Sequence, residues 1–185
     1  MSRVPLLCAD TACEQAAPTL RGIHKQLGML PNFFAGMAHH GGALNGYLAF
    51  EQQLGKESRL NKSQRERLAL AIANENGCHY CVSGHTLAAK GAGLSDEEAR
   101  HAQMGRATAP LDQAVLDLGL AVLRQHGHLE DAQVAAAREA GVDDATLVEV
   151  VALVGLNSYS NWLNNVMQPP IDFPEVALVE TPDQG

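Results

Sequence analysis

Glycine and proline divide this chain into segments that otherwise favour the α-helix. The clearest is LNKSQRERLALAIANENG, residues 60–77, with candidate N-caps at Asn61 and Ser63, an alanine- and leucine-rich middle, and Gly77 as its stop. No segment shows the polar–apolar alternation of a half-buried strand. We therefore expect an all-α fold.

The same signals place the other helices. Pro18 suits the first turn of a helix that Gly28 ends, and Ser95 and Glu98 form a capping-box pattern. We expect a single domain over residues 1–185, with a mobile N-terminal extension (about 1–17), a core (about 18–167) and a C-terminal tail (about 168–185) that wraps or dangles. Helices are predicted at 18–27, within 30–42, at about 43–54, from the first cysteine of CHYC to Lys90, from Ser95, and at 110–125, 131–140 and 144–167.

Composition narrows the class of protein. The chain is 46% hydrophobic but only 4% aromatic, and the alanine, leucine and valine that dominate favour closely packed helices. A formal net charge of −8 without a basic run argues against nucleic acid and anionic membranes as partners. No apolar stretch approaches about 18 residues and the N-terminus lacks a signal-peptide core, so we expect a cytoplasmic protein. In that compartment four cysteines suit reactive or metal-binding roles better than structural disulfides.

A faint internal repeat relates two helical segments. LNKSQRERLALAIANENGCHYC and VDDATLVEVVALVGLNSYSNWLN superpose at an offset of 83, which places Cys78 on Asn161 and Cys81 on Asn164. The match is as consistent with a degenerate duplication as with a chance likeness of two amphipathic helices. If it is real, thiol chemistry belongs to the first copy alone.

The stretch NGCHYCVSGH, residues 76–85, carries the strongest chemical signal. Cys78 follows the helix stop Gly77, so Cys81 should lie in the first turn of the next helix, where free amides and the helix dipole stabilise a thiolate. His85 lies one turn further on the same face. This stripe fits a redox thiol pair, a Cys2His zinc site with an open position, or two packed thiols, and its spacing leaves all three open.

Glu66 lies twelve residues before Cys78, on a helix face that continues with apolar residues at 69, 70 and 73. A carboxylate in that setting is partly desolvated, which suits proton transfer. The pattern Ser63-x-x-Glu66 is also a capping box, and Thr146-x-x-Glu149 repeats it. From spacing alone, the capping role is favoured.

Taken together, RERLALAIANENGCHYCVSGH resembles the signature of the AhpD-like alkylhydroperoxidase family, in the carboxymuconolactone decarboxylase superfamily. That signature is a glutamate, an alanine-rich helix and then C-x-x-C-x-x-x-H. The flanks LGMLPNFFAGMAHH and LVEVVALVGLNSYSNWLNNV are similar to its peroxidase-related branch, so the likeness spans about residues 20–170. The resemblance implies an all-helical domain that forms a homo-oligomer, a trimer or hexamer.

Residue by residue, the resemblance makes Cys81 the peroxidatic cysteine, Cys78 the resolving cysteine, and Glu66 and His85 the acid–base relay. The founding enzymes carry a further histidine immediately before the second cysteine, where this chain has Tyr80, with His79 one place earlier. A phenol there can hydrogen-bond but does not shuttle protons near neutral pH.

The activity implied is reduction of a hydroperoxide by a thiol-dependent peroxidase that needs no organic cofactor and no metal. An external dithiol, a lipoyl protein or a thioredoxin-like protein, would regenerate the thiols. The alternative is a redox-sensing or Cys2His metal-binding helical protein without peroxidase turnover. Cys8 and Cys13 are interpreted as incidental, and His39 and His40 as exposed or interfacial.

Overall fold

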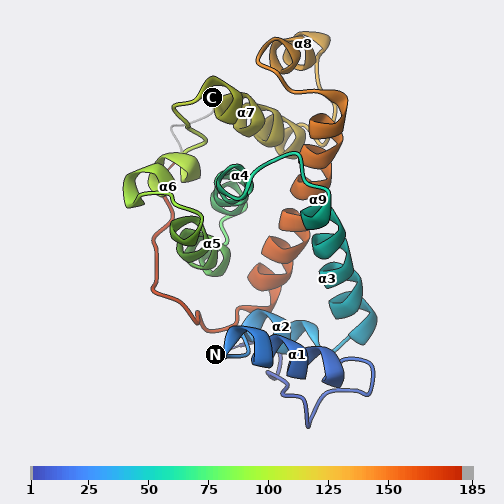
Figure 1. Cartoon of the computed structure of the whole chain (residues 1–185). Helices are drawn as coiled ribbons and strands as arrows, with labels where there is room; N and C mark the ends of the chain where they lie inside the picture. The colour runs from blue at the N-terminus through green and yellow to red at the C-terminus, as the bar shows by residue number, and fades with distance from the viewer. Residues whose placement is uncertain (1, 181–185) are drawn as a thin grey trace.

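The structure is a computed structural model that describes residues 2–180, and within them it contains nine helices and no strand (Figure 1). The predicted all-α fold is confirmed. The helices are α1 (Ala17–Leu27), α2 (Asn32–Met37), α3 (Gly41–Lys56), α4 (Lys62–Glu75), α5 (His79–Gly91), α6 (Asp96–Gln103), α7 (Pro110–Arg124), α8 (Asp131–Glu139) and α9 (Asp144–Met167).

Helix α4 lies at the centre and contacts α5, α6, α7 and α9. Leu68, Leu70 and Ile72 of α4 are fully buried, because small alanines between them allow the neighbouring helices to approach closely. One apolar cluster fills the space between α4, α7 and α9. A second joins α1, α2 and α3 to the start of α5 and contains Cys78 and Cys81. The predicted thiol pair therefore lies within the core.

Most predicted helix ends agree with the structure. Gly28 ends α1 in the left-handed region with φ 73°, and Ser95 and Glu98 form the predicted capping box of α6. Helix α3 begins earlier than expected because the Nδ1 atom of His40 accepts a hydrogen bond from the backbone N–H of Ala43.

The predicted capping role of Ser63 and Glu66 is wrong. Asn61 is the N-cap of α4: its side chain accepts from the backbone N–H of Gln64, and its own N–H donates to the Gln64 side chain, both at 3.0 Å. This reciprocal pair satisfies the first turn of α4. Glu66 lies beyond that turn, so its carboxylate is free for another partner.

The second predicted capping box is wrong as well. Asp143 caps α9 by accepting from the backbone N–H of Thr146 at 2.7 Å. Glu149 accepts instead from the backbone N–H of Arg59 at 2.7 Å and from Ser58. Residues 61–82 form parts of two helices with a break between them, whereas residues 144–165 lie in one continuous helix. The aligned segments therefore do not share one geometry.

Both ends of the described chain pack against the helices. The N-terminal segment, expected to be mobile, donates backbone hydrogen bonds from Arg3 to Met167 and from Leu7 to Ala35. The tail wraps: residues 169–180, the C-terminal strap, run from the end of α9 past α5 toward α6 (Figure 1). None of the helices within residues 2–180 is long and apolar enough to cross a bilayer.

Candidate active site

The break between α4 and α5 sets the position of both cysteines. Gly77 adopts a left-handed conformation with φ 63°, and the backbone N–H of Cys78 donates to the carbonyl of Ala73 at 2.9 Å. The chain thus reverses after α4, and Cys78 becomes the N-cap of α5. Its sulfur accepts a hydrogen bond from the backbone N–H of Cys81 at 3.2 Å. The predicted placement of Cys81 in the first turn of a new helix is observed.

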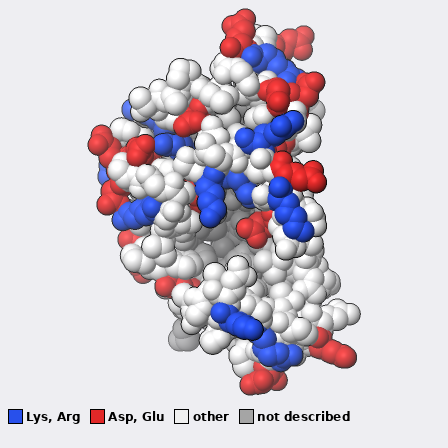
Figure 2. All heavy atoms as spheres, in the orientation of Figure 1, with Lys and Arg blue, Asp and Glu red and all other residues white. Residues whose placement is uncertain are grey.

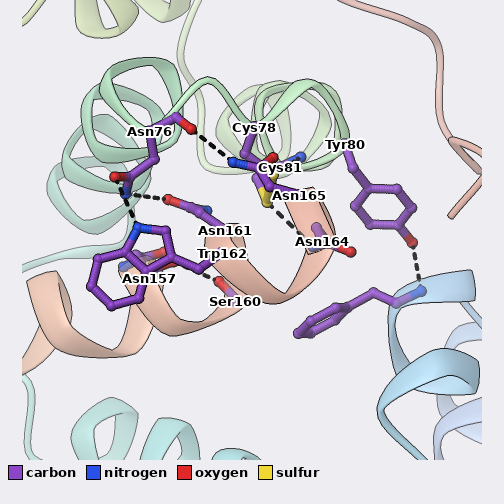
Figure 3. Close-up of a disulfide and its surroundings, with 11 residues drawn as sticks. Asn76, Cys78, Tyr80, Cys81, Asn157, Ser160, Asn161, Trp162, Asn164 and Asn165 are labelled. Atoms are coloured by element: carbon purple, nitrogen blue, oxygen red, sulfur yellow. Dashed lines mark hydrogen bonds between the residues drawn. A yellow bond between two sulfur atoms is a disulfide. The ribbon is translucent and has the colours of Figure 1, made fainter. Parts of the chain in front are cut away.

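Cys78 and Cys81 form a disulfide across this first turn, with their Cα atoms 5.3 Å apart (Figure 3). Their surroundings differ. Cys78 is fully buried, whereas Cys81 is 6% exposed and lines a cavity beside α5. A reagent that enters this cavity meets the sulfur of Cys81 first.

Glu66 and His85 are hydrogen-bonded, with 2.9 Å between the carboxylate Oε2 and the ring Nδ1. Both side chains are partly buried, and both line the cavity that contains Cys81. Desolvation by itself would lower the pKa of His85, but the hydrogen bond and charge of Glu66, with the charge of Glu51, together raise it above its usual value. Three of the residues that the sequence analysis selected, Cys81, His85 and Glu66, therefore line one cavity.

Asn164 of α9 is a fourth polar group at this point, and the sequence prediction missed it. Its side-chain amide donates to the sulfur of Cys81 at 3.3 Å, and the residue is 4% exposed (Figure 3). Its side-chain carbonyl oxygen is buried and has no hydrogen-bond partner among the described residues. Burying an amide whose oxygen has no hydrogen-bond partner costs free energy. Its position at the Cys81 sulfur is therefore expected to serve the site.

Other asparagines attach α9 to the linker between α4 and α5. Asn76 donates to the side chain of Asn161 at 3.0 Å, its carbonyl accepts from Asn165 at 2.8 Å, and its side-chain oxygen accepts from the Trp162 ring at 3.3 Å (Figure 3). The crowding of asparagines around Trp162 thus fixes the linker that carries Cys78. The family resemblance suggests that NSYSNWLNNV packs near the thiol helix or a subunit interface, and these hydrogen bonds place it against the linker that precedes the thiol helix.

Hydrogen bonds of the Tyr80 hydroxyl give this residue a structural role. Its hydroxyl donates to Asp172 of the C-terminal strap at 2.5 Å and accepts from the backbone N–H of Phe33 at 3.2 Å. Burial, reinforced by the hydrogen bond to Asp172, raises the pKa of Tyr80 above its ordinary value. The phenol stays protonated at neutral pH and links α5 to α2 and the strap, while the neighbouring His79 is exposed.

The cavity beside α5 has a volume of about 450 Å³, within the range of small-molecule sites. Helices α1, α2, α3, α4 and α9, the turn between α1 and α2, and the strap supply the rest of its wall. Figure 2 shows a hollow on this face beside α5, and acidic and basic side chains are intermixed around it. Cys81 occupies its wall together with the Glu66–His85 pair.

Other predicted residues lie outside this site. Cys8 and Cys13 are free and exposed. His39 contacts the carbonyl of Pro5 at 2.8 Å, and His40 caps α3. Within residues 2–180, no group of three or more histidine, cysteine, aspartate or glutamate side chains is arranged to hold a metal ion.

Comparison with known proteins gives a family match over part of the chain and a fold match over most of it. Residues 42–117, which include the glutamate, both cysteines and the histidine of the site, match the model of the carboxymuconolactone decarboxylase family. The fold is that of a structure from Ralstonia eutropha JMP134 described as an alkylhydroperoxidase AhpD core, with a TM-score of 0.84, 23% identity and coverage of 92% of each chain. The predicted likeness to the AhpD-like branch of the carboxymuconolactone decarboxylase superfamily is confirmed.

Two further structures share the AhpD-like fold. A peroxidase-related protein from Silicibacter sp. TM1040 has a TM-score of 0.79 and 20% identity, with coverage of 95% of this chain and 92% of the other. The debrominase Bmp8, in complex with 2,3,4-tribromopyrrole, has a TM-score of 0.72 and 18% identity, with coverage of 93% and 94%. A comparison with curated proteins gives no match. At these identities the likeness establishes the AhpD-like fold, and the site geometry has to support any reaction.

Proposed function

We propose that the protein is a thiol-dependent peroxidase that reduces hydroperoxides through Cys78 and Cys81. The observation that carries the proposal is the shared cavity: Cys81, the more exposed of the two cysteines, lines it together with the hydrogen-bonded pair of Glu66 and His85. A nucleophilic thiol next to an oriented acid–base pair is the arrangement that such chemistry needs. The AhpD-like fold and its peroxidase-related neighbours support the same class of reaction.

In the first step, His85, oriented by Glu66, takes the proton of the Cys81 thiol directly or through a water molecule. The thiolate attacks the distal oxygen of the hydroperoxide, so an S–O bond forms as the O–O bond breaks. The departing alkoxide takes a proton from His85 and leaves as an alcohol. The amide of Asn164, which donates to the Cys81 sulfur, stabilises the thiolate, and the positive end of the α5 dipole adds to this effect.

In the second step, the sulfur of the Cys78 thiol attacks the sulfenic acid of Cys81, its proton passes to the departing hydroxyl, and water leaves as the disulfide forms. The bonded pair in the structure corresponds to this oxidised state. An external dithiol then reduces the disulfide by exchange. We propose that this reductant is a lipoyl protein or a thioredoxin-like protein. One hydroperoxide and one dithiol become one alcohol, one water and one disulfide.

The proposal is tested by counting thiols before and after peroxide treatment, in a Cys8→Ser/Cys13→Ser background. Both of these cysteines are exposed and would otherwise react with peroxide themselves. The reduced protein should lose two thiols on treatment with one equivalent of hydroperoxide, and mass spectrometry should locate the disulfide at residues 78 and 81. With dihydrolipoamide as the reductant, turnover should continue. Loss of two thiols without turnover would favour the redox-sensing alternative, and stoichiometric zinc in protein purified without chelator would favour the metal site.

A competing substrate tests the reaction class. One structure with this fold is a debrominase, so 2,3,4-tribromopyrrole is added to the reduced protein and bromide is measured. We expect hydroperoxide reduction to exceed bromide release by at least about tenfold. Bromide release as the faster reaction would replace the peroxidase proposal with reductive debromination.

We also propose that the protein is a homo-oligomer, a trimer or hexamer. The outer face of α9 exposes apolar side chains along its length, including Val148, Val151, Trp162 and Val166 at 44–65% exposure. Single exposed apolar residues are ordinary, but a stripe of them along one helix suits burial against another copy. Analytical ultracentrifugation should detect an assembly that Trp162→Glu dissociates, and a monomeric wild-type protein would contradict this.

A further inference from the structure

The aromatic residues of this chain are concentrated at one place. The sequence holds four phenylalanines, three tyrosines and one tryptophan, and five of these eight line the cavity at Cys81. They come from α2, α3, α5 and the strap, and adjacent rings lie 5.0–6.5 Å apart between centroids. Such separations are typical of favourable aromatic contacts. The five are Phe33, Phe34, Tyr47, Tyr80 and Phe173.

The charge of the cavity wall restricts its ligand further. Among the described residues that line it there is no lysine or arginine, whereas Glu51 and Glu66 contribute carboxylates. The imidazole of His85 is already bonded to Glu66. Inside the cavity, an anionic group on a ligand would meet two carboxylates and no lysine or arginine of the lining, so the cavity favours a neutral molecule.

The entrance is apolar as well. Leu27, Met29 and Leu87 line the cavity and are 53%, 36% and 50% exposed. Large exposed apolar side chains that gather around one opening mark a ligand-binding groove more often than an inert surface. A ring-shaped molecule can therefore pass from water to Cys81 along continuous apolar surface.

Phe173 closes this wall from the C-terminal strap, and the strap is tied on both sides of it. Asp172 accepts hydrogen bonds from Tyr80 and from the backbone N–H of Asn32, and the N–H of Val176 donates to Ser83 at 3.0 Å.

The ring itself rests on Gly84, where a Cβ would lie 3.1 Å from the Cε2 atom of Phe173. Gly84 therefore allows Phe173 to lie against α5, one turn beyond Cys81. The strap thus places one ring in the wall of the cavity that Cys81 also lines.

We propose that the cavity selects neutral, ring-containing organic hydroperoxides and that Phe173 is its specificity-determining residue. The proposal rests on the peroxidase function proposed above and adds to it the chemical class of the substrate. The aromatic wall binds the ring of the substrate, and the hydroperoxide group points to Cys81. Hydrogen peroxide lacks the ring, and a fatty-acid hydroperoxide brings a carboxylate that the two acids disfavour.

The test compares kcat/KM for cumene hydroperoxide, hydrogen peroxide and linoleic acid hydroperoxide in the full-length wild-type chain and its variants. We expect the wild-type value for cumene hydroperoxide to be at least about tenfold above the others. Phe173→Ala should lower that value about tenfold and change the value for hydrogen peroxide less than about twofold. Phe50→Ala, which removes an exposed aromatic ring outside the cavity, is the matched control.

Phe173→Leu removes the ring but keeps an apolar side chain on the strap, so it separates loss of the ring from loss of folding. This variant should retain the helical circular dichroism of the wild type. Its preference for cumene hydroperoxide should lie between those of the wild type and Phe173→Ala. Equal kcat/KM for all three peroxides in the wild type would overturn the inference and leave the peroxidase function standing. Calorimetry with 2-phenyl-2-propanol and the oxidised protein measures ring binding without turnover. If no hydroperoxide is reduced, binding that Phe173→Ala abolishes would uphold the ring site, and absence of binding would overturn it.

Discussion

The two segments that align in the sequence behave differently in the structure, and the site depends on that difference. Around Gly77 the first segment breaks, so that α4 ends and Cys78 caps a new helix. The second segment continues as one helix, α9, for 24 residues. A break exposes backbone N–H groups and a dipole end, which can stabilise a thiolate, whereas a continuous helix has none to offer at its middle.

The continuous helix contributes in another way. Asn164, which the alignment places on Cys81, contacts that very residue: its amide donates to the Cys81 sulfur. Asn161, aligned with Cys78, bonds to Asn76 in the linker before the break. The broken segment thus supplies the reactive atoms, and the unbroken one supplies the polar wall that holds them.

Removing the reactive sulfur of the broken segment should have the largest effect. Cys81→Ser replaces the thiolate by a hydroxyl that is not ionised at neutral pH, so peroxide turnover should fall by about a thousandfold or more. Cys78→Ser should retain a single round of reaction and accumulate a sulfenic acid, which dimedone labels. Steady-state rates and mass spectrometry measure both variants. If Cys81→Ser keeps its activity and Cys78→Ser loses it, the two roles are reversed.

Glu66→Gln should have the next largest effect, about a hundredfold on the rate, because His85 loses the partner that orients it and stabilises the imidazolium formed when it takes the Cys81 proton. Without this carboxylate, the pKa of His85 should fall, since the hydrogen bond and charge of Glu66 are what raise it. NMR titration of the His85 ring measures this shift. Glu51→Gln, which removes only a more distant charge, should shift the same pKa in the same direction but less.

The same pair predicts a pH dependence of stability. A histidine whose pKa is higher in the folded than in the unfolded protein stabilises the fold fully below its unfolded pKa of about 6.5. That contribution is lost as the pH rises through the folded pKa. The wild type should therefore exceed Glu66→Gln in unfolding free energy by more at pH 6 than at pH 9, as urea unfolding can measure. A constant difference between these pH values would show that the two side chains do not form an ion pair.

Asn164→Ala tests the contribution of the continuous helix. Loss of the amide donor should raise the pKa of the Cys81 thiol, since a hydrogen bond to a charged group contributes about 1.5–3 kcal/mol. The rate at neutral pH should fall about tenfold and recover at alkaline pH. Alkylation rates against pH measure the thiol pKa directly. Asn165→Ala removes a neighbouring exposed asparagine that contacts Asn76 instead, so an equal shift in both variants would contradict the assignment.

The helix ends show what the sequence could predict. The signals that end or begin a helix through contacts within one turn predict its ends correctly, and these are Gly28, Gly77 and the Ser95–Glu98 capping box. The capping of α4 was mispredicted because Asn61-x-x-Gln64 and Ser63-x-x-Glu66 offer equivalent local chemistry two residues apart. Distant groups favour the first choice: Gln64 also reaches Asp112 at 2.8 Å, and Glu66 reaches His85.

The site was predictable to the extent that it is local. Cys78, Cys81 and His85 lie within eight residues, so helical spacing alone predicts a stripe, and of the three Cys81 and His85 line the cavity. Asn164 and the strap that carries Phe173 lie more than 80 residues away, and no spacing rule connects them to Cys81. Only the packing of α9 and the path of the tail past α5 bring them together.

The smallest effects are expected from two glycines, and they should have opposite signs. Gly77 has φ 63°, so Gly77→Ala forces a side chain into the left-handed region and should cost about 1–2 kcal/mol of unfolding free energy. For a chain of this size, each kcal/mol lowers Tm by roughly 2–4 °C. Gly155, within α9, has open space where a Cβ would lie, so Gly155→Ala should add about 0.5–1 kcal/mol. Calorimetric melting compares the two variants.

Destabilisation by both substitutions would mean that α9 needs its glycine for contact with another surface. Stabilisation by both would mean that the break at Gly77 does not require a left-handed residue.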